Sequence, residues 1–268
     1  MLRNVVFKPV SGFVEKYQNL KFEKRSRIED GTESTRLITL DRYFYYMYSS
    51  TLERMLEELD LAMANSPKIL ELGSSGGITK KVDQKIFTSD IRIGSNLDLI
   101  LDASIIPIKS NSIDGIIAKD VLHHIPNIEK HFKEVERVLK VGGKVVYAEP
   151  NWNFISRIVF TFFHPEPWVE NVKSWNFQSN DPMYSNQARS KIIFIRDITL
   201  FSELFPKLIV NVKDVPINAL SHLLSLGIYA KKKIVPRSIL IQLSKLEHKS
   251  NIWMKLFGFM RIIVLEKT

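Results

Sequence analysis

The residue pattern with the clearest chemical meaning is a Gly-rich turn that follows an apolar run. The sequence Ile-Leu-Glu-Leu-Gly-Ser-Ser-Gly-Gly occupies residues 69–77. Glycine in such a turn lets the backbone approach a ligand closely and frees the amides at the start of the next helix. Similar turns also join strands to helices for packing reasons alone, so this stretch by itself leaves open a nucleotide-type site or a plain tight turn.

A carboxylate after the next apolar run strengthens the ligand hypothesis. Asp90 stands nineteen residues after Glu71, at the predicted carboxyl end of the adjacent strand. There it can accept both hydroxyls of a ribose bound over the turn. The alternative is a solvated loop aspartate. The chain lacks the Gly-x-Gly-x-x-Gly spacing of dehydrogenases, which argues against a nicotinamide cofactor.

The elements that must position these residues are predicted from the spacing of apolar side chains. From residue 68 onward, short apolar runs alternate with helical stretches, which indicates βα units around a parallel sheet. The predicted strands are 68–72, 85–89, 97–101, 113–118, 144–149, 208–215 and 260–266. The predicted helices are 121–141, ended by Val141-Gly142-Gly143, and 196–205. Upstream, an amphipathic helix is predicted from Leu52, Met55, Leu56, Leu59 and Met63.

Six segments in this order resemble the motifs of class I S-adenosylmethionine-dependent methyltransferases. They are residues 71–77, Asp90, 101–107, 112–117, 121–125 and 139–144. Together they cover about residues 66–150, roughly a third of the chain. The resemblance implies an α/β, Rossmann-like fold: a seven-stranded, mostly parallel sheet with an antiparallel last strand and helices on both faces. Residues 151–195 and 216–258 would then be two inserted capping segments.

The resemblance also implies a role for each residue at the ends of these strands. Glu71 and the turn through Gly73, Ser74, Ser75 and Gly76 would hold the methionine part of S-adenosylmethionine. The family usually has Gly where Ser75 stands. The other implied cofactor residues are Asp90 and Ile91 at the ribose, Asp102 and Ala103 at the adenine, and Lys119 and Asp120 at the sulfonium and the acceptor.

Three side chains are candidates for the general base that a hydroxyl acceptor requires. His164 and Glu166 belong to a His-Pro-Glu-Pro-Trp segment in the region where such families build acceptor pockets. A histidine flanked by proline can also be a packed turn. His124 follows His123 where the family commonly has two histidines opening a helix, so this pair is either structural or lines the cofactor pocket. No His, Asp or Glu group has the spacing of metal ligands, and no metal is expected.

The charge is concentrated at one end of the sequence. The net charge is +9, and residues 231–268 hold nine basic residues against two acidic ones. Apolar residues there approximate one helical face, and they are Ile239, Leu240, Leu243, Leu246, Ile252, Trp253, Leu256 and Phe257. This pattern predicts an interfacial helix on an anionic membrane, a lid packed on its own core, or a surface that stacks on RNA. Residues 66–150 are nearly neutral, which argues against nucleic acid.

These observations predict a single domain, residues 1–268, that transfers a methyl group to a hydroxyl or amine. Its parts are a helical segment (1–65), a cofactor core (66–150), an acceptor-side insertion (151–195), the end of the sheet (196–215 and 259–268) and a basic helical insertion (216–258). Residues 151–157 and 164–167 resemble segments of bacterial methyltransferases of surface-polysaccharide pathways. The first hypothesis for the acceptor is therefore a saccharide or a lipid-linked glycan. The alternatives are an RNA, a small metabolite, or a non-catalytic binding protein.

Two further features bear on the compartment. The chain contains no cysteine, which excludes a disulfide scaffold and favours the cytoplasm. No apolar stretch reaches the roughly 20 residues of a membrane span. The expected location is the cytoplasm, with peripheral contact at the inner membrane surface.

Overall fold

The computed structural model describes residues 32–61, 66–162, 164, 166–179, 181, 184–211, 216–217, 219–227 and 233–268. Some of the sequence predictions lie outside these ranges. They are the first 31 residues of the helical segment, Met63, the end of the strand predicted at 208–215, and Lys231 and Lys232.

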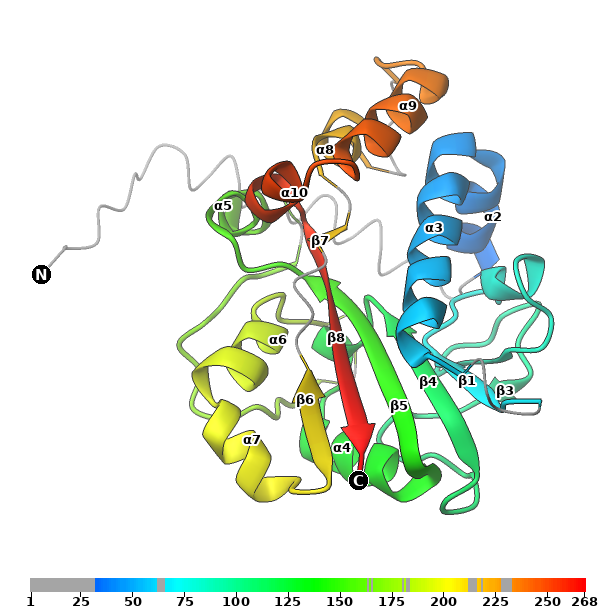
Figure 1. Ribbon diagram of the computed structural model, residues 1–268, viewed down its shortest axis with the longest axis vertical. Coiled ribbons are helices and arrows are strands. Elements are labelled where there is room, and N and C mark those ends of the chain that lie inside the picture. Colours follow the sequence, from blue (N-terminus) through cyan, green and yellow to red (C-terminus); the bar gives the residue numbers. More distant parts are fainter. Residues whose placement is uncertain are drawn as a thin grey trace, which may run out of the picture.

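The strands form one mixed sheet in the order β3-β2-β1-β4-β5-β8-β6 (Figure 1). They are β1 (Ile69–Leu72), β2 (Phe87–Asp90), β3 (Leu99–Ile100), β4 (Ile113–Lys119), β5 (Leu139–Pro150), β6 (Leu208–Asn211) and β8 (Met260–Lys267). The pairs among β1 to β5 are parallel, and β8 runs antiparallel to both of its neighbours. A short extra strand, β7 (Pro216–Ile217), pairs with the start of β8. The predicted seven-stranded sheet with an antiparallel last strand is confirmed.

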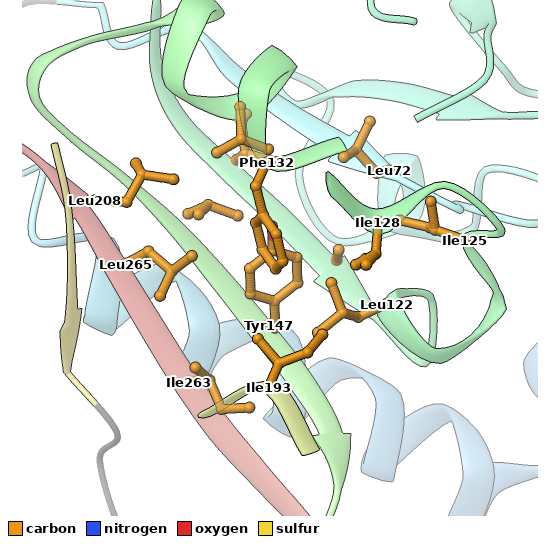
Figure 2. Close-up of a cluster of buried hydrophobic side chains, with 14 of the residues drawn as sticks. Leu72, Leu122, Ile125, Ile128, Phe132, Tyr147, Ile193, Leu208, Ile263 and Leu265 are labelled. Carbon is orange, nitrogen blue, oxygen red and sulfur yellow. The ribbon is translucent and has the colours of Figure 1, made fainter. Parts of the chain in front are cut away.

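Alternating side chains of the central strand β5 build a core on each face of the sheet. Val145 and Tyr147 point into the larger core, against α4 (Ile128–Val138) and α7 (Ile198–Leu204). Figure 2 shows Phe132 of α4 lying over Tyr147 in this core. Val146 and Ala148 point to the other face, which α3 (Arg42–Leu59) covers. The helices therefore lie on both faces, as predicted.

The prediction of one helix over 121–141 is wrong, because the helix in the structure is shorter at both ends. The chain forms one 3-10 turn, Leu122–His124, and then α4 begins at Ile128. Pro126 explains the interruption, because the residue before a proline disfavours the helical region. The helix also ends early, at Val138, since Leu139 already pairs with Ile113 in the sheet. Gly142 does have the expected positive φ, +77°, but it lies in an irregular part of β5 and does not end a helix.

The amphipathic helix before the sheet is longer at its start than the apolar spacing indicates. Helix α3 begins at Arg42, where the carboxylate of Asp41 accepts from the amides of Tyr43 and Phe44. It ends at Leu59, and Asp60 follows in the left-handed region. A shorter helix, α2 (Thr32–Leu40), precedes it.

Both insertions contain helices, and the first one is mostly irregular between its two helical parts. After β5 the chain forms α5 (Phe154–Phe162), and α6 (Arg189–Lys191) continues into a π-helical turn, Ile192–Arg196. The predicted helix over 196–205 corresponds to α7. The basic insertion contains α8 (Leu220–Leu224), α9 (Arg237–Glu247) and α10 (Asn251–Phe257). Within the described ranges, no helix combines the length and the hydropathy that a membrane span requires.

Candidate active site

The Gly-rich turn lies between β1 and a 3-10 turn, Ile78–Lys81, which takes the place of the expected helix. Gly73 and Gly77 both have a φ of +71°. A Cβ at Gly77 would lie 2.1 Å from the backbone oxygen of Asn96, so this position requires glycine. Ser75 also adopts a left-handed φ of +57°, which costs a non-glycine residue about 1 kcal/mol. Its hydroxyl bonds to that of Ser34 at 2.6 Å, so the serine is accommodated by α2.

The amides of this turn do not point into open space, contrary to the expectation. The amide of Ser75 donates to Asp90 Oδ2 at 2.8 Å, and that of Gly76 donates to Thr35 Oγ1 at 2.9 Å. The amide of Gly77 donates to the oxygen of Ser74 at 2.9 Å. A ligand at the turn would therefore be held mainly by side-chain acceptors.

Glu71 supplies one such acceptor at the end of β1. Its Oε1 accepts from the hydroxyls of Tyr48 and Thr79, at 2.8 and 2.7 Å. Its Oε2 is buried and has no hydrogen-bond partner. Burial raises the pKa of this carboxyl above its ordinary value. The methionine ammonium of S-adenosylmethionine is a cationic donor that fits this acceptor, and pairing would favour the ionised form.

Asp90 supplies the second acceptor, at the end of β2. Its carboxylate is buried and already accepts from the amide of Ser75, and from the amide and Nε of Arg92 at 2.9 and 3.3 Å. A carboxylate has about four acceptor positions, so one remains on Oδ2. One ribose hydroxyl fits there directly. A second ribose hydroxyl would bind at Oδ1 by displacing Arg92 Nε, whose hydrogen bond to that oxygen is long.

Of the two residues predicted at the adenine end, Ala103 is hydrogen-bonded to α4 and Asp102 to the nearby Ser104. Asp102 Oδ1 accepts from the amide and hydroxyl of Ser104, and the oxygen of Ala103 accepts from His131 Nδ1 at 2.8 Å. Because a carbonyl only accepts, Nδ1 of His131 carries the proton, and Nε2 then accepts from the Tyr147 hydroxyl at 2.7 Å. This buried histidine therefore fixes the loop that would face the adenine. Ile91, beside Asp90, is half exposed.

The position of His131 predicts a loss of stability in acid. Burial lowers its pKa from 6.5 to about 4, so only the unfolded chain takes up this proton between these values. The contribution to the free energy of unfolding is complete above pH 6.5 and falls by about 3 kcal/mol towards pH 4. Urea unfolding at several pH values should show a shallower decline over this range for His131→Gln than for the wild type. Equal declines would contradict this assignment.

A second group of titratable side chains follows β4, directly after the ion pair of Lys119 and Asp120. Glu149 Oε1 accepts from the amides of Val121 and Leu122, and its Oε2 lies 2.6 Å from His123 Nδ1. His123 Nε2 lies 3.4 Å from Glu166 Oε2. Burial opposes the charged ring, but the carboxylates of Glu149 and Glu166 outweigh it and raise the pKa of His123 to about 10. In the absence of a ligand, His123 is an imidazolium between two carboxylates.

The structure brings the side chains of two of the three candidate bases together, whereas the third contacts the backbone of Glu166. His124 Nε2 lies 3.9 Å from Glu166 Oε2, and Glu166 is buried and contacts Gln187. His164 accepts from the amide of Glu166 at 3.3 Å, while its ring packs edge-on against Phe160. His124 and Glu166 therefore share one cluster, and the His164 ring packs against α5.

Several residues at these sites have no counterpart among the sequence predictions. Tyr48, Thr35 and Ser34 come from the N-terminal helices, and no local spacing connects them to the turn. Glu149, however, ends β5 just as Glu71 and Asp90 end β1 and β2. A search for carboxylates at every strand end would have found it.

The acceptor-side insertion lines a partly open pocket of about 340 Å³. Its lining includes Trp175, Phe177, Tyr184 and Arg189. The guanidinium of Arg189 lies 4.2 Å from the centre of the Phe177 ring. Tyr184 also accepts from His124 through its carbonyl, at 3.2 Å, so the cavity adjoins the His124 cluster.

A comparison with protein families identifies the core. Residues 76–147 match the family described as "Methyltransferase domain", and the strand order and strand-end residues agree with this match. This part of the chain is therefore similar to a methyltransferase domain, in agreement with the class I S-adenosylmethionine-dependent methyltransferase core that the sequence predicts. The match supports the predicted enzyme class and the predicted cofactor, S-adenosylmethionine, for this core.

The proteins to which this chain is similar are distant from it. Phosphoethanolamine N-methyltransferase 2 of Caenorhabditis elegans is 40% identical over 47 residues, which cover 18% of this chain and 11% of that relative. A SAM-dependent methyltransferase from Archaeoglobus fulgidus is 13% identical, with a TM-score of 0.49 over 85% of this chain and 100% of that one. A putative sarcosine dimethylglycine methyltransferase from Galdieria sulphuraria is 16% identical, with a TM-score of 0.43 over 82% and 86%. None of them defines an acceptor for this chain.

Proposed function

We propose that this methyltransferase acts on an acceptor presented at an anionic membrane surface, with a hydroxyl or amine of a lipid-linked saccharide as the first candidate. The observation that carries the proposal is a surface of exposed apolar and basic side chains at the edge of the sheet where the Gly-rich turn also lies. S-adenosylmethionine would supply the methyl group. The protein would orient the acceptor in line with the sulfonium.

The exposed apolar side chains lie on α5, α9 and α10, and we call them the apolar rim. They are Phe154, Phe162, Ile239, Leu246, Ile252 and Leu256. Ile252 is 76% exposed and Phe154 74% exposed. The helical face predicted for this region is therefore divided, because Leu240 is buried against α3 while its neighbours face outward. Large exposed apolar side chains in a group indicate an interaction surface.

The charges around the apolar rim favour an anionic partner. Lys245, Lys249 and Lys255 are exposed among the rim residues. Glu247 is the one acidic residue between positions 233 and 258. It is buried and accepts from the hydroxyl of Ser221 at 2.7 Å. Lysines between apolar side chains suit a membrane with anionic headgroups, which contributes about 1 kcal/mol per basic residue.

The apolar rim lies at the edge of the sheet where the cofactor site is expected. Helix α5 follows the carboxyl end of β5, and α10 precedes β8, which runs the opposite way (Figure 1). Glu71 and Asp90 end strands at this same edge. An acceptor anchored in a membrane under the rim would thus approach the side of the sheet at which ligands of such folds bind.

Sedimentation with vesicles tests this proposal. We expect the protein to pellet with phosphatidylglycerol vesicles at about 20 mM salt, to be released at about 500 mM, and to stay in solution with phosphatidylcholine alone. The double variant Ile252→Ser and Leu256→Ser should lose binding. Val141→Ser, which removes an exposed apolar side chain from the opposite part of β5, should retain it. If the wild type does not bind anionic vesicles at low salt, a small soluble metabolite becomes the better hypothesis.

A further inference from the structure

We propose that His123, His124 and Glu166 form a binding site for a divalent transition metal ion such as Zn²⁺. One ligand atom from each lies within 4.8 Å of the others. Zinc binds imidazole nitrogen at about 2.0–2.1 Å and carboxylate oxygen at about 2.0–2.2 Å, so two ligand atoms of a tetrahedral ion are about 3.3 Å apart. Glu166 Oε2 lies 3.4 Å from His123 Nε2 and 3.9 Å from His124 Nε2. Small movements would bring the three atoms to one ion, and the ion would displace the proton that His123 Nε2 otherwise directs at Glu166.

Both histidines are oriented as metal ligands are. A histidine that binds a metal normally donates its other ring N–H to a carboxylate or a backbone carbonyl. His123 Nδ1 bonds to Glu149 at 2.6 Å, and His124 Nδ1 bonds to the oxygen of Tyr184 at 3.2 Å. Because that carbonyl only accepts, Nε2 of a neutral His124 is an acceptor that faces the carboxylate oxygen of Glu166. A cation between these two atoms would be bound by both.

Gln187 provides an independent observation. Its side chain is buried, its Nε2 contacts Glu166 Oε2, and its Oε1 has no hydrogen-bond partner. A half-turn of the amide would exchange the two atoms and place the oxygen beside Glu166. Without a cation that arrangement is repulsive. With an ion present, Gln187 Oε1 would be a fourth oxygen or nitrogen donor.

The position of the site defines what the ion would do. The histidines belong to the turn after β4, whereas Glu166 and Gln187 belong to the acceptor-side insertion. An ion shared between them would fix the insertion to the core next to Lys119 and Asp120. His123 and Glu166 are almost fully buried and His124 is partly accessible, so the ion would enter from the side of His124. Two imidazoles and a carboxylate suit divalent transition metal ions such as Zn²⁺ and Co²⁺ better than Ca²⁺ or Mg²⁺.

Titration of the whole chain with Zn²⁺, after treatment with EDTA, tests this site. We expect one ion per chain and a melting temperature that rises by about 5–10 °C at a 100-fold excess of Zn²⁺ over its Kd. Co²⁺ in the same site should show the visible absorption of a tetrahedral N/O complex. No S-adenosylmethionine is present in this measurement, so its outcome is independent of the proposed function.

Variants distinguish this site from adventitious binding. His124→Ala and Glu166→Gln should each weaken Zn²⁺ binding at least about 100-fold, and Glu149→Gln about 10- to 100-fold. His248→Ala removes an exposed histidine that follows α9 and should leave the affinity unchanged. A folded wild type that binds no Zn²⁺ or Co²⁺ would overturn the proposal. Unchanged binding in both His124→Ala and Glu166→Gln would do so as well.

Discussion

Replacing Asp90 with Asn is expected to weaken S-adenosylmethionine binding about 100-fold. The charged carboxylate at the end of β2 has one acceptor position free and a second held only by the 3.3 Å bond from Arg92 Nε. A hydrogen bond from a ribose hydroxyl to a carboxylate contributes about 1.5–3 kcal/mol. The neutral amide loses the charge and replaces one acceptor by a donor. Calorimetric titration of both proteins gives the two affinities directly.

Asp114→Asn is the matched control for this substitution. Asp114 lies near the opposite end of β4, where it accepts from the amide of Lys68 at 2.9 Å and pairs with Lys140 at 2.7 Å. Its replacement removes the same charge from β4, at the edge of the sheet opposite the Gly-rich turn. The affinity for S-adenosylmethionine should stay within about twofold of the wild type. Equal affinities of Asp90→Asn and the wild type would show that Asp90 does not bind the ribose.

Replacing Glu149 with Leu is expected to lower the free energy of unfolding by about 3–5 kcal/mol. The carboxylate accepts from the amides of Val121 and Leu122 and from His123 Nδ1, and the side chain is fully buried. Leucine leaves three buried donors without acceptors and removes one of the two carboxylates that hold the charged ring. Breaking a buried ion pair from one side costs this amount.

Urea unfolding in the presence of EDTA measures the effect on the metal-free protein. Glu149→Gln keeps one acceptor and should lose less stability than Glu149→Leu. Glu266→Leu, at an exposed position of β8, should change stability by less than about 0.5 kcal/mol. A loss below about 1 kcal/mol for Glu149→Leu would mean that its hydrogen bonds are replaced by water.

The sheet could be predicted because each strand is identified by residues that are close together in the sequence. Short apolar runs separated by turn residues give strands buried on both faces, and a single apolar stripe identifies α4 and α7. The ends of the helices were harder to predict where a proline, a strand pairing or a helix cap overrides the spacing of the apolar residues. Pro126 divides the predicted helix over 121–141, and Leu139 is taken into the sheet by pairing with Ile113. The start of α3 depends on a cap at Asp41, which lies before the apolar spacing begins.

The site could be predicted only in part, because its residues come together from distant positions. Glu71 and Asp90 are recognisable since each ends a strand at a fixed distance from the turn. The partners of Glu71 and Gly76 are Tyr48 and Thr35, 23 and 41 residues away, and no spacing reports such contacts. The pairing of His124 with Glu166 likewise depends on how the acceptor-side insertion folds back onto the turn after β4.

Calorimetric titration of the wild-type protein with S-adenosylmethionine tests most directly whether these strand ends form a cofactor site. Saturable binding of one molecule per chain is expected, with a Kd of about 1–100 μM, in the range usual for enzyme ligands. The methionine ammonium would engage Glu71 Oε2, the buried acceptor without a partner. A folded protein that shows no binding of S-adenosylmethionine would contradict the assignment of Glu71 and Asp90, and would indicate that the chain keeps the methyltransferase fold without its chemistry.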